Sequence, residues 1–398
     1  MKLGGDAVRR VLAVAAATAT ITLTTAATSP TTAPVEQASE AIPGNYIVRL
    51  ADDPVPSVAT AAADLAARYG GEVGFTYESA LRGFSVRDLT EHAAARLAAD
   101  PTVAAVSQDG VARGTGVQEN PPSWGLDRVD QEDLPLDARY TYENTAEDVA
   151  IYNLDSGIRP SHRDFADRIV MGPDFVADGQ DGVDCHGHGT HTAGTSAGTT
   201  FGVAKGAALH SVRVLGCDNA APDSVIIAGL DWVAAEASER PAVVNFSIYT
   251  DTKHVADKAV RGVIDSGVAF VVAAGNADID ACESGPAHLP EAITVGATDE
   301  HDRRAEFSNW GPCLDLFAPG VRIDSAGHEA DDGVTTMQGT SMAAPHVTGA
   351  VALYLAEHPE AEQAEVEAAL VERATEDTVQ DAKPGSPDLF LNAHAMAH

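Results

Sequence analysis

Basic residues are scarce in this chain of 398 residues, because 25 Lys and Arg stand against 59 Asp and Glu and give a formal net charge of −34. Such an acidic chain repels a polyanion, so the composition excludes nucleic-acid binding as the main activity. Aromatic residues are also few, at 5%. Hydrophobic residues still make up 44% of the chain. We therefore expect a folded protein with a sizeable core rather than a disordered one.

Cysteines are few as well: four in a chain this long cannot define a disulfide scaffold. Beyond the N-terminus no run is long and apolar enough to predict a membrane-spanning helix. The one such run, Val11–Ala27, follows Lys2, Arg9 and Arg10 and contains several threonines, which is typical of an export signal and too polar for a stable anchor. We expect residues 1–27 to be a signal peptide and the mature protein to be secreted, extracellular and not bound to the membrane.

Residues 28–44 lack hydrophobic periodicity and are interpreted as a linker. Residues 45–110 alternate strand and helix patterns and predict a small α+β domain. The patterns predict strands at 46–50, 81–86 and 102–106 and helices at 58–69 and 91–98. Residues 111–123 combine Gly and Pro without apolar periodicity, so we expect an exposed linker that is open to proteolysis.

From residue 124 to 392 apolar strand patterns alternate with helix patterns, which predicts an α/β domain with a mostly parallel sheet and helices on both faces. The expected strands are 149–154, 211–215, 243–247, 268–274 and 292–295, and the expected helices are 224–237, 254–266 and 341–355. Ligands of such sheets gather at the carboxyl ends of the strands. Residues that follow those ends are therefore the candidates for chemistry.

Four positions offer a chemically complete set. Asp155 and Asn276 each follow a predicted strand, and Ser341 begins a predicted helix, where free N–H groups favour an anion. His186, His188 and His191 supply imidazoles. A serine needs a base to attack a carbonyl, and that base needs a carboxylate to orient it, so Asp, His and Ser fit nucleophilic catalysis. The three histidines also fit a zinc site, which leaves a metallohydrolase as an alternative.

Four segments carry a family resemblance: Asp155–Gly157, His188–Gly194, Ala273–Asn276 and Gly339–Ala343. With them, the stretch from Trp124 to Leu391 resembles the subtilisin-like serine proteases of the proteinase K-like branch. The chain order Asp, His, Ser is that of subtilisins.

The resemblance implies a triad of Asp155, His188 and Ser341, with Asn276 and the Ser341 N–H as the oxyanion hole. It selects His188 over the two neighbouring histidines. It also implies that residues 45–110 form an inhibitory, fold-assisting propeptide of ferredoxin-like fold, and that polypeptides are the substrates.

Family position further implies two disulfides, Cys185–Cys217 and Cys282–Cys313. It implies a structural Ca²⁺ held by Asp315 and the carbonyls of Pro290 and Ala292, while catalysis needs no cofactor. An ordinary surface role for Asp315 remains an alternative.

Two substrate-binding segments depart from the family pattern. The implied substrate contacts are Ala220, Ala221, Ser247, Ile248, Tyr249, Ala273, Ala274 and Gly275. Pro222 and Tyr249 stand where the family has open glycine-rich backbone, so we expect a narrowed pocket and a preference for small residues.

The sequence as a whole predicts a monomeric, secreted serine endopeptidase that is made as an autoprocessed preproenzyme and inhibited by its own propeptide. A subtilisin-like binding protein with weak or no activity is the alternative that the altered cleft suggests.

Overall fold

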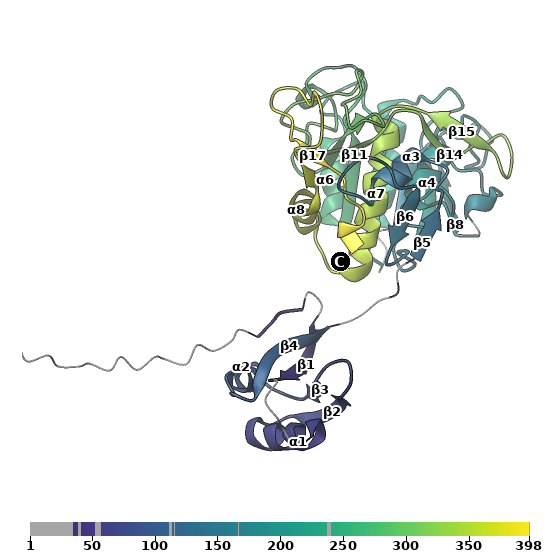
Figure 1. Cartoon of the computed structure of the whole chain (residues 1–398). Helices are drawn as coiled ribbons and strands as arrows, with labels where there is room; N and C mark the ends of the chain where they lie inside the picture. The colour runs from purple at the N-terminus through teal and green to yellow at the C-terminus, as the bar shows by residue number, and fades with distance from the viewer. Residues whose placement is uncertain are drawn as a thin grey trace, which may run out of the picture. The chain divides into compact units, whose positions relative to one another are not determined.

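The computed structural model describes residues 35–38, 41–51, 57–110, 114, 116–165, 167–236 and 240–397. The predicted signal peptide and most of the predicted linker at 28–44 lie outside these residues. The chain divides into an N-terminal unit, Met1–Ala112, and a C-terminal unit, Arg113–His398 (Figure 1). Within the described residues, no helix has the length and apolarity that crossing a membrane requires.

The N-terminal unit is a four-stranded antiparallel sheet with two helices. Its elements are β1 (Ala41–Leu50), α1 (Val58–Tyr69), β2 (Glu72–Tyr77), β3 (Gly83–Arg87), α2 (Glu91–Ala98) and β4 (Val103–Gly110). The strand order is β2-β3-β1-β4. This βαββαβ arrangement is the ferredoxin-like fold, so the predicted fold of this region is confirmed.

Local signals explain these elements. The Ser57 side chain accepts a hydrogen bond from Thr60 N and begins α1, and Thr90 does the same for α2 through Ala93 N. The predicted start of the module at residue 45 is wrong, because β1 begins at Ala41, whose partner is Gly110 at the end of β4. No sequence pattern predicts β2, because its side chains are mostly exposed and show no apolar alternation.

The C-terminal unit is built on a nine-stranded sheet with the order β16-β17-β13-β12-β11-β10-β7-β9-β8. Two further pairs, β5-β6 and β14-β15, form separate two-stranded sheets. The strands of the whole unit are β5 (Gly116–Glu119), β6 (Arg139–Tyr142), β7 (Ala150–Asp155), β8 (Ile169–Asp174), β9 (Ala208–Arg213), β10 (Ala242–Phe246), β11 (Val268–Ala273), β12 (Ile293–Thr298), β13 (Leu316–Pro319), β14 (Ile323–Ala326), β15 (Val334–Met337), β16 (Thr375–Glu376) and β17 (Leu389–Phe390). Its helices are α3 (Trp124–Arg128), α4 (His188–Ala197), α5 (Asp223–Ala235), α6 (Asp257–Asp265), α7 (Thr340–Glu357) and α8 (Gln363–Arg373).

Helices cover both faces of this sheet, as predicted. Ile151 on β7 packs into the same core as Ala193 of α4 and Val347 of α7. The next residue, Tyr152, faces the opposite core, with Leu230 of α5. Because successive strand side chains point to opposite faces, the central strands β7, β10 and β11 serve both cores and are buried along their whole length. Figure 1 shows α7 running through the middle of the unit.

Parallel pairing places the carboxyl ends of the central strands at one edge of the sheet. β7 pairs with β9 on one side and with β10 on the other, and β10 pairs with β11, all in parallel. The chain therefore changes direction of winding at β7, the position where ligands of open α/β sheets bind. The residues that follow β10 and β11, and Asp155 at the end of β7, share this edge.

Three details correct the sequence analysis. The predicted linker 111–123 extends too far, because β5 within it pairs with β6 from Gly116↔Tyr142 to Glu119↔Arg139. Its pattern of alternating half-buried and exposed side chains is too weak to see in four residues. The strand expected at 211–215 begins at Ala208, and the half-exposed β8 was missed. Both disulfides are formed as the resemblance implied.

Candidate active site

Asp155 and His188 meet at the carboxyl end of β7. Asp155 is the last residue of β7 and is fully buried, and His188 is the first residue of α4. His188 Nδ1 donates to Asp155 Oδ1 at 2.7 Å and lies 2.9 Å from Oδ2. A carboxylate only accepts hydrogen bonds, so Nδ1 carries the proton and a neutral imidazole presents a free lone pair at Nε2. The pair therefore holds a base in a fixed orientation.

Two opposed effects set the pKa of His188. Burial lowers it, but the charge of Asp155, its hydrogen bond and the more distant charge of Asp184 raise it, and the net pKa lies above the ordinary value of 6.5. The imidazolium form is thus stabilised by its partner, as a general base requires.

The turn before α4 is held by the Asp184 carboxylate. It accepts hydrogen bonds from Ser156 Oγ at 2.9 Å, from the backbone N–H of Gly187 at 2.8 Å and from the backbone N–H of Thr190 at 2.9 Å. A Cβ at Gly189 would lie 2.1 Å from the Gly157 carbonyl, so only glycine allows α4 to approach the turn after β7 this closely. These contacts fix where His188 starts its helix.

Ser341 forms a reciprocal pair with Ser247, the residue that follows β10. Its Oγ donates to the Ser247 carbonyl at 3.2 Å, and Ser247 Oγ donates to the Ser341 carbonyl at 2.9 Å. Pro345 lies four residues later in α7 and has no N–H, so the Ser341 carbonyl has no helical donor and is free to accept this bond. The first turn of α7 is thereby attached to the end of the sheet.

Asn276 presents its amide group to the same edge. Its Oδ1 accepts from the N–H of Thr340 at 2.8 Å and from the Thr340 hydroxyl at 3.0 Å. Oδ1 is thus occupied, and the Nδ2 group remains as the donor of this amide. The turn itself is held by Asn309, whose Nδ2 donates to the Ala274 carbonyl at 2.8 Å and whose Oδ1 accepts from Ala277 N at 3.0 Å.

A cleft with a volume of about 530 Å³ joins these groups. The predicted site residues that line it are His188, Ser341, Asn276, Ala220, Ala221, Ser247, Ile248 and Tyr249. Ala273 and Ala274 are buried and are not among its lining residues, and Gly275 is half-buried behind Asn276. Among the described residues no hydrogen bond joins Ser341 Oγ to His188.

The other two histidines of the cluster do not converge on His188. His191 is buried and its Nε2 contacts the Ile323 carbonyl at 2.9 Å, and burial lowers its pKa to about 4. The rings of His186 and His188 are 6.4 Å apart. In the described part of the chain these three imidazoles form no metal-ligating group, so the zinc interpretation of the cluster is wrong.

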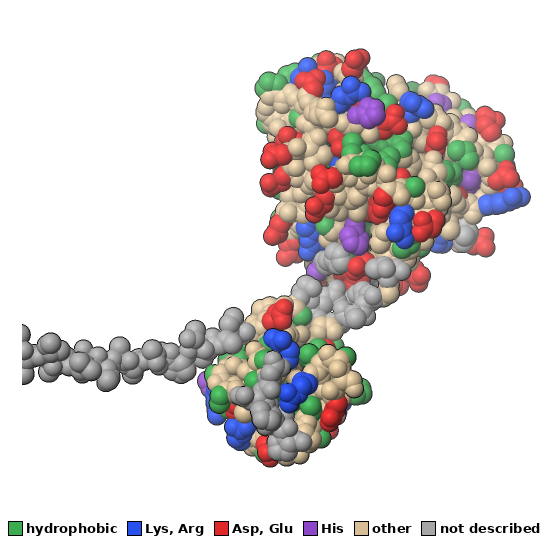
Figure 2. Space-filling model, in the orientation of Figure 1, with side chains coloured by type: hydrophobic (Ala, Val, Ile, Leu, Met, Phe, Trp, Pro, Cys, Tyr) green, Lys and Arg blue, Asp and Glu red, His purple; other side chains and the backbone are tan. Residues whose placement is uncertain are grey.

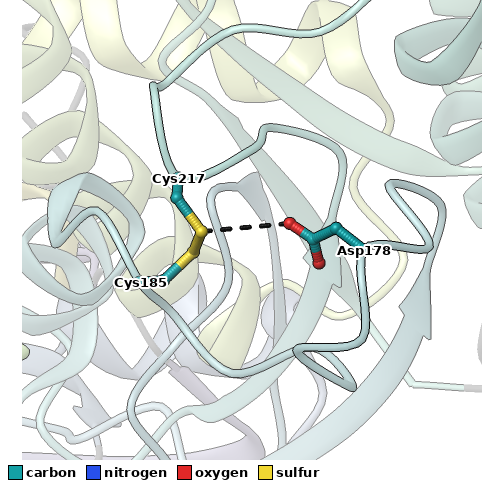
Figure 3. Close-up of side chains that lie close together, drawn as sticks. All are labelled: Asp178, Cys185 and Cys217. Carbon is teal, nitrogen blue, oxygen red and sulfur yellow. Dashed lines mark hydrogen bonds between the residues drawn. A yellow bond between two sulfur atoms is a disulfide. The ribbon is translucent and has the colours of Figure 1, made fainter.

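The Cys185–Cys217 disulfide lies beside Asp178, with Cys217 Sγ 3.9 Å from Oδ2 (Figure 3). Both sulfurs are bonded to each other, so this group offers no thiolate to a metal. The buried guanidinium of Arg213 donates to Asp178 Oδ1 at 2.6 Å, to Asp174 Oδ2 at 2.9 Å and to the carbonyl of Ser156 at 3.1 Å. This ion pair network braces the turn that follows Asp155.

The chemistry around Asp315 fits a cation. Its Oδ2 accepts from the N–H of Thr294, two residues after Ala292, at 2.7 Å. Burial raises its pKa to about 7, and its charged neighbour is a second acid, Glu367. A half-buried carboxylate that has lost much of its hydration and whose neighbour is also acidic gains most from a bound divalent ion, and oxygen donors suit Ca²⁺.

A parallel α/β sheet that carries a serine, a histidine and an aspartate at its carboxyl edge has the arrangement of a serine hydrolase. A protein-family model described as the subtilase family matches residues 146–389. The "Extracellular serine proteinase" of Thermus sp. (strain Rt41A) is 46% identical over 374 residues, which cover 89% of this chain and 90% of that protein.

Two further relatives agree. The "Alkaline serine exoprotease A" of Vibrio alginolyticus is 42% identical over 81% of this chain and 60% of its own length. The crystal structure of a cold adapted subtilisin-like serine proteinase matches with a TM-score of 0.66 and 46% identity, over 68% of this chain and 97% of that one. The protein is a serine-type peptidase. The chain belongs to the subtilase family.

Sequence reasoning missed the residues that hold the site. Asp184 directly precedes Cys185 and the histidine cluster, and an Asp three residues before a glycine is a common turn former. Asn309 lies in a segment, 307–311, that resembles the family, but no local pattern ties it to Asn276. Only the folded chain brings these partners together.

The pKa of His188 predicts how activity depends on pH. If His188 is the general base, it must be neutral to act, so kcat/KM falls as the pH drops through the raised pKa of His188 and is fully retained above it. Asp155→Asn removes the charge that raises this pKa, so the acid limb moves to lower pH, and the plateau falls on the order of 10⁴-fold. Peptide hydrolysis over roughly pH 5 to 9 measures both effects. An acid limb that stays in place in Asp155→Asn contradicts the assignment of the base.

Proposed function

We propose that this chain is a secreted serine endopeptidase that uses Asp155, His188 and Ser341 as its triad. The observation that carries the proposal is the meeting of β7, α4 and α7 at one cleft, with the His188–Asp155 bond at 2.7 Å and Ser341 in the same lining. The complete set of groups favours an active enzyme over a binding protein with the same fold.

Ser341 attacks the carbonyl carbon of the peptide bond. Its hydroxyl leaves the Ser247 carbonyl and gives its proton to His188 Nε2, and Asp155 stabilises the resulting imidazolium. His188 then protonates the leaving amine, which releases the first product and leaves an acyl-enzyme. Water, deprotonated by the same imidazole, hydrolyses the ester and restores Ser341.

The oxyanion is stabilised by Asn276 Nδ2 and the Ser341 N–H. The hydrogen bonds from Thr340 fix the amide before substrate binds, so little reorganisation is needed when charge develops. One such donor contributes about 3 to 4 kcal/mol of barrier lowering.

The remaining segments complete a preproenzyme. Residues 1–27 direct export, the module ending at Gly110 assists folding and inhibits the enzyme, and the enzyme cuts itself between the two units before acting as a monomer. The module has a core of its own, which includes Val48, Leu65 and Phe84, so it is able to fold as a separate body. The net charge is −34, and acidic side chains are scattered over the face of the C-terminal unit that Figure 2 shows, which suits a protein free in solution.

Ser341→Ala tests the nucleophile and autoprocessing together. We expect the secreted wild type to lose the N-terminal unit and to gain one adduct on Ser341 from a serine-directed phosphonate, while Ser341→Ala stays full length and unlabelled. Intact mass and peptide mapping measure both. Ser161→Ala, which removes an exposed hydroxyl that does not line the cleft, is the matched control and is still labelled. A wild type that stays full length and unlabelled makes the binding-protein alternative the better account.

We also propose that Asp315 and the carbonyls of Pro290 and Ala292 hold a structural Ca²⁺. In the Ser341→Ala background, Ca²⁺ at 100 times its Kd is expected to stabilise the folded chain by about 2.7 kcal/mol. Asp315→Asn removes this gain, whereas Asp148→Ala, an exposed acid, keeps it. Thermal unfolding with and without Ca²⁺ measures the difference. An equal gain in Asp315→Asn rules out this ligand set.

Tyr249 is proposed to narrow the pocket for the residue before the cut. It lines the cleft next to Ile248, and its side chain is 72% exposed. The wild type is expected to prefer small residues, and Tyr249→Gly to raise kcat/KM for Phe and Tyr substrates on the order of 10-fold. A peptide library compares the two enzymes. Equal cutting by the wild type after Phe, Tyr, Leu and Ala disproves this role.

A further inference from the structure

Two histidines and an aspartate from separate segments converge outside the triad. His254 lies in the loop before α6, Asp257 is the first residue of α6, and His288 lies in the loop between β11 and β12. Their ligand atoms all lie within 4.8 Å of one another. The two imidazole rings meet edge to face with centroids 4.6 Å apart.

The hydrogen bonds of His288 fix its ring. Its Nδ1 lies 3.0 Å from the Ser284 carbonyl, which only accepts, so Nδ1 carries the proton. In the neutral imidazole the lone pair of Nε2 then points at Asp257 Oδ2, 3.2 Å away. Two lone pairs facing each other repel, so this contact requires a positive charge between them. A proton on Nε2 or a bound metal ion supplies it.

The carboxylate has capacity for such an ion. Asp257 Oδ2 also faces His254 Nδ1 at 2.9 Å, and Asp257 Oδ1 is buried without a hydrogen-bond partner among the described residues. Donors of a tetrahedral zinc site lie roughly 3.3 Å apart, given Zn–N and Zn–O bonds near 2.0 Å. The two N–O distances, 2.9 and 3.2 Å, are close to this separation, so little movement is needed.

We infer that His254, Asp257 and His288 form a binding site for a divalent transition metal ion, with Zn²⁺ as the best match. Imidazole and carboxylate together select zinc over calcium, which takes oxygen ligands alone. The His288 Nδ1–H bond to a backbone carbonyl is the outer contact that metal-ligating histidines commonly make. His254 is 67% exposed, which leaves a route for entry and a fourth position for water.

The site joins two loops next to the cleft. The segment of Tyr249 reaches the second loop through Thr250 N, which donates to the Gly285 carbonyl at 2.9 Å. The charge of Lys253 on the first loop is balanced by Glu283 on the second, 3.4 Å away. A bound ion adds a third link, from His254 to His288. It therefore connects the loop that follows Tyr249, which lines the cleft, to the loop that carries Cys282.

The test is calorimetric titration of the full chain with ZnCl₂ in excess Ca²⁺, in the Ser341→Ala background to prevent self-digestion. We expect one tight site, weakened at least about 10-fold by His254→Ala and by His288→Asn, since removing a ligand costs no less than removing an outer contact. His301→Ala, which removes another exposed histidine, keeps the affinity. Because His254 is exposed, His254→Ala is expected to unfold at the parent temperature without metal.

Co²⁺ provides the second readout. The parent with Co²⁺ is expected to show the visible absorption of a tetrahedral site, and His254→Ala to lose it. Zn²⁺ is expected to raise the unfolding temperature of the parent more than that of His254→Ala. If the parent binds no Zn²⁺, or if both histidine variants bind it as tightly as the parent, the site is refuted. These measurements do not depend on peptidase activity, so their failure leaves the proposed function intact.

Discussion

The site depends on one buried hydrogen bond between two strands. Asn153 of β7 and Asn245 of β10 are register partners in the sheet, and Asn245 Nδ2 donates to Asn153 Oδ1 at 3.0 Å. Each amide then reaches a helix: Asn153 Nδ2 donates to the Gly189 carbonyl in α4, and Asn245 Oδ1 accepts from the hydroxyl of Thr348 in α7. All these groups are fully buried, so breaking one bond leaves donors without water. The helix of the histidine and the helix of the serine are thus held to the strand of the aspartate.

Electrostatics and backbone chemistry reinforce the same positions. Ser341 stands at the N-terminal end of an 18-residue helix, where the dipole and free N–H groups favour an anion. Pro345 has no N–H to donate to the Ser341 carbonyl within the helix, and the hydroxyl of Ser247, the residue after β10, donates to that carbonyl instead. The same residue that anchors α7 also accepts, through its carbonyl oxygen, the hydrogen bond that the Ser341 hydroxyl donates. The contacts between Ser247 and Ser341 therefore both fix the start of α7 and hold the Ser341 hydroxyl in place.

Residues with local chemistry were predictable from the sequence. The helices at 58–69 and 91–98 were placed with their observed bounds, because capping residues and apolar spacing are short-range signals. Asp155, Asn276 and Ser341 were predicted as site residues because they lie at the ends of predicted strands or begin a predicted helix, and Asn276 and Ser341 line one cleft. Edge strands such as β8 escaped, since half-exposed strands need no apolar run. The sequence did not predict the roles of Asp184 and Asn309 or the contact between His254 and His288 for a different reason. Folding alone brings these partners together, and their spacing in the sequence does not indicate it.

The small number of residues between β4 and β5 along the chain has a consequence for control of the enzyme. Under the proposed function, residues 111–115 connect the inhibitor to a strand that is already paired with β6. A tether of this length keeps the inhibitor at an effective concentration on the order of millimolar, even where its intrinsic affinity is modest. A single cut turns this intramolecular partner into a free solute whose concentration equals that of the enzyme. Dilution after export then sets when the enzyme becomes active, because the fraction of enzyme free of inhibitor rises as the concentration of both chains falls.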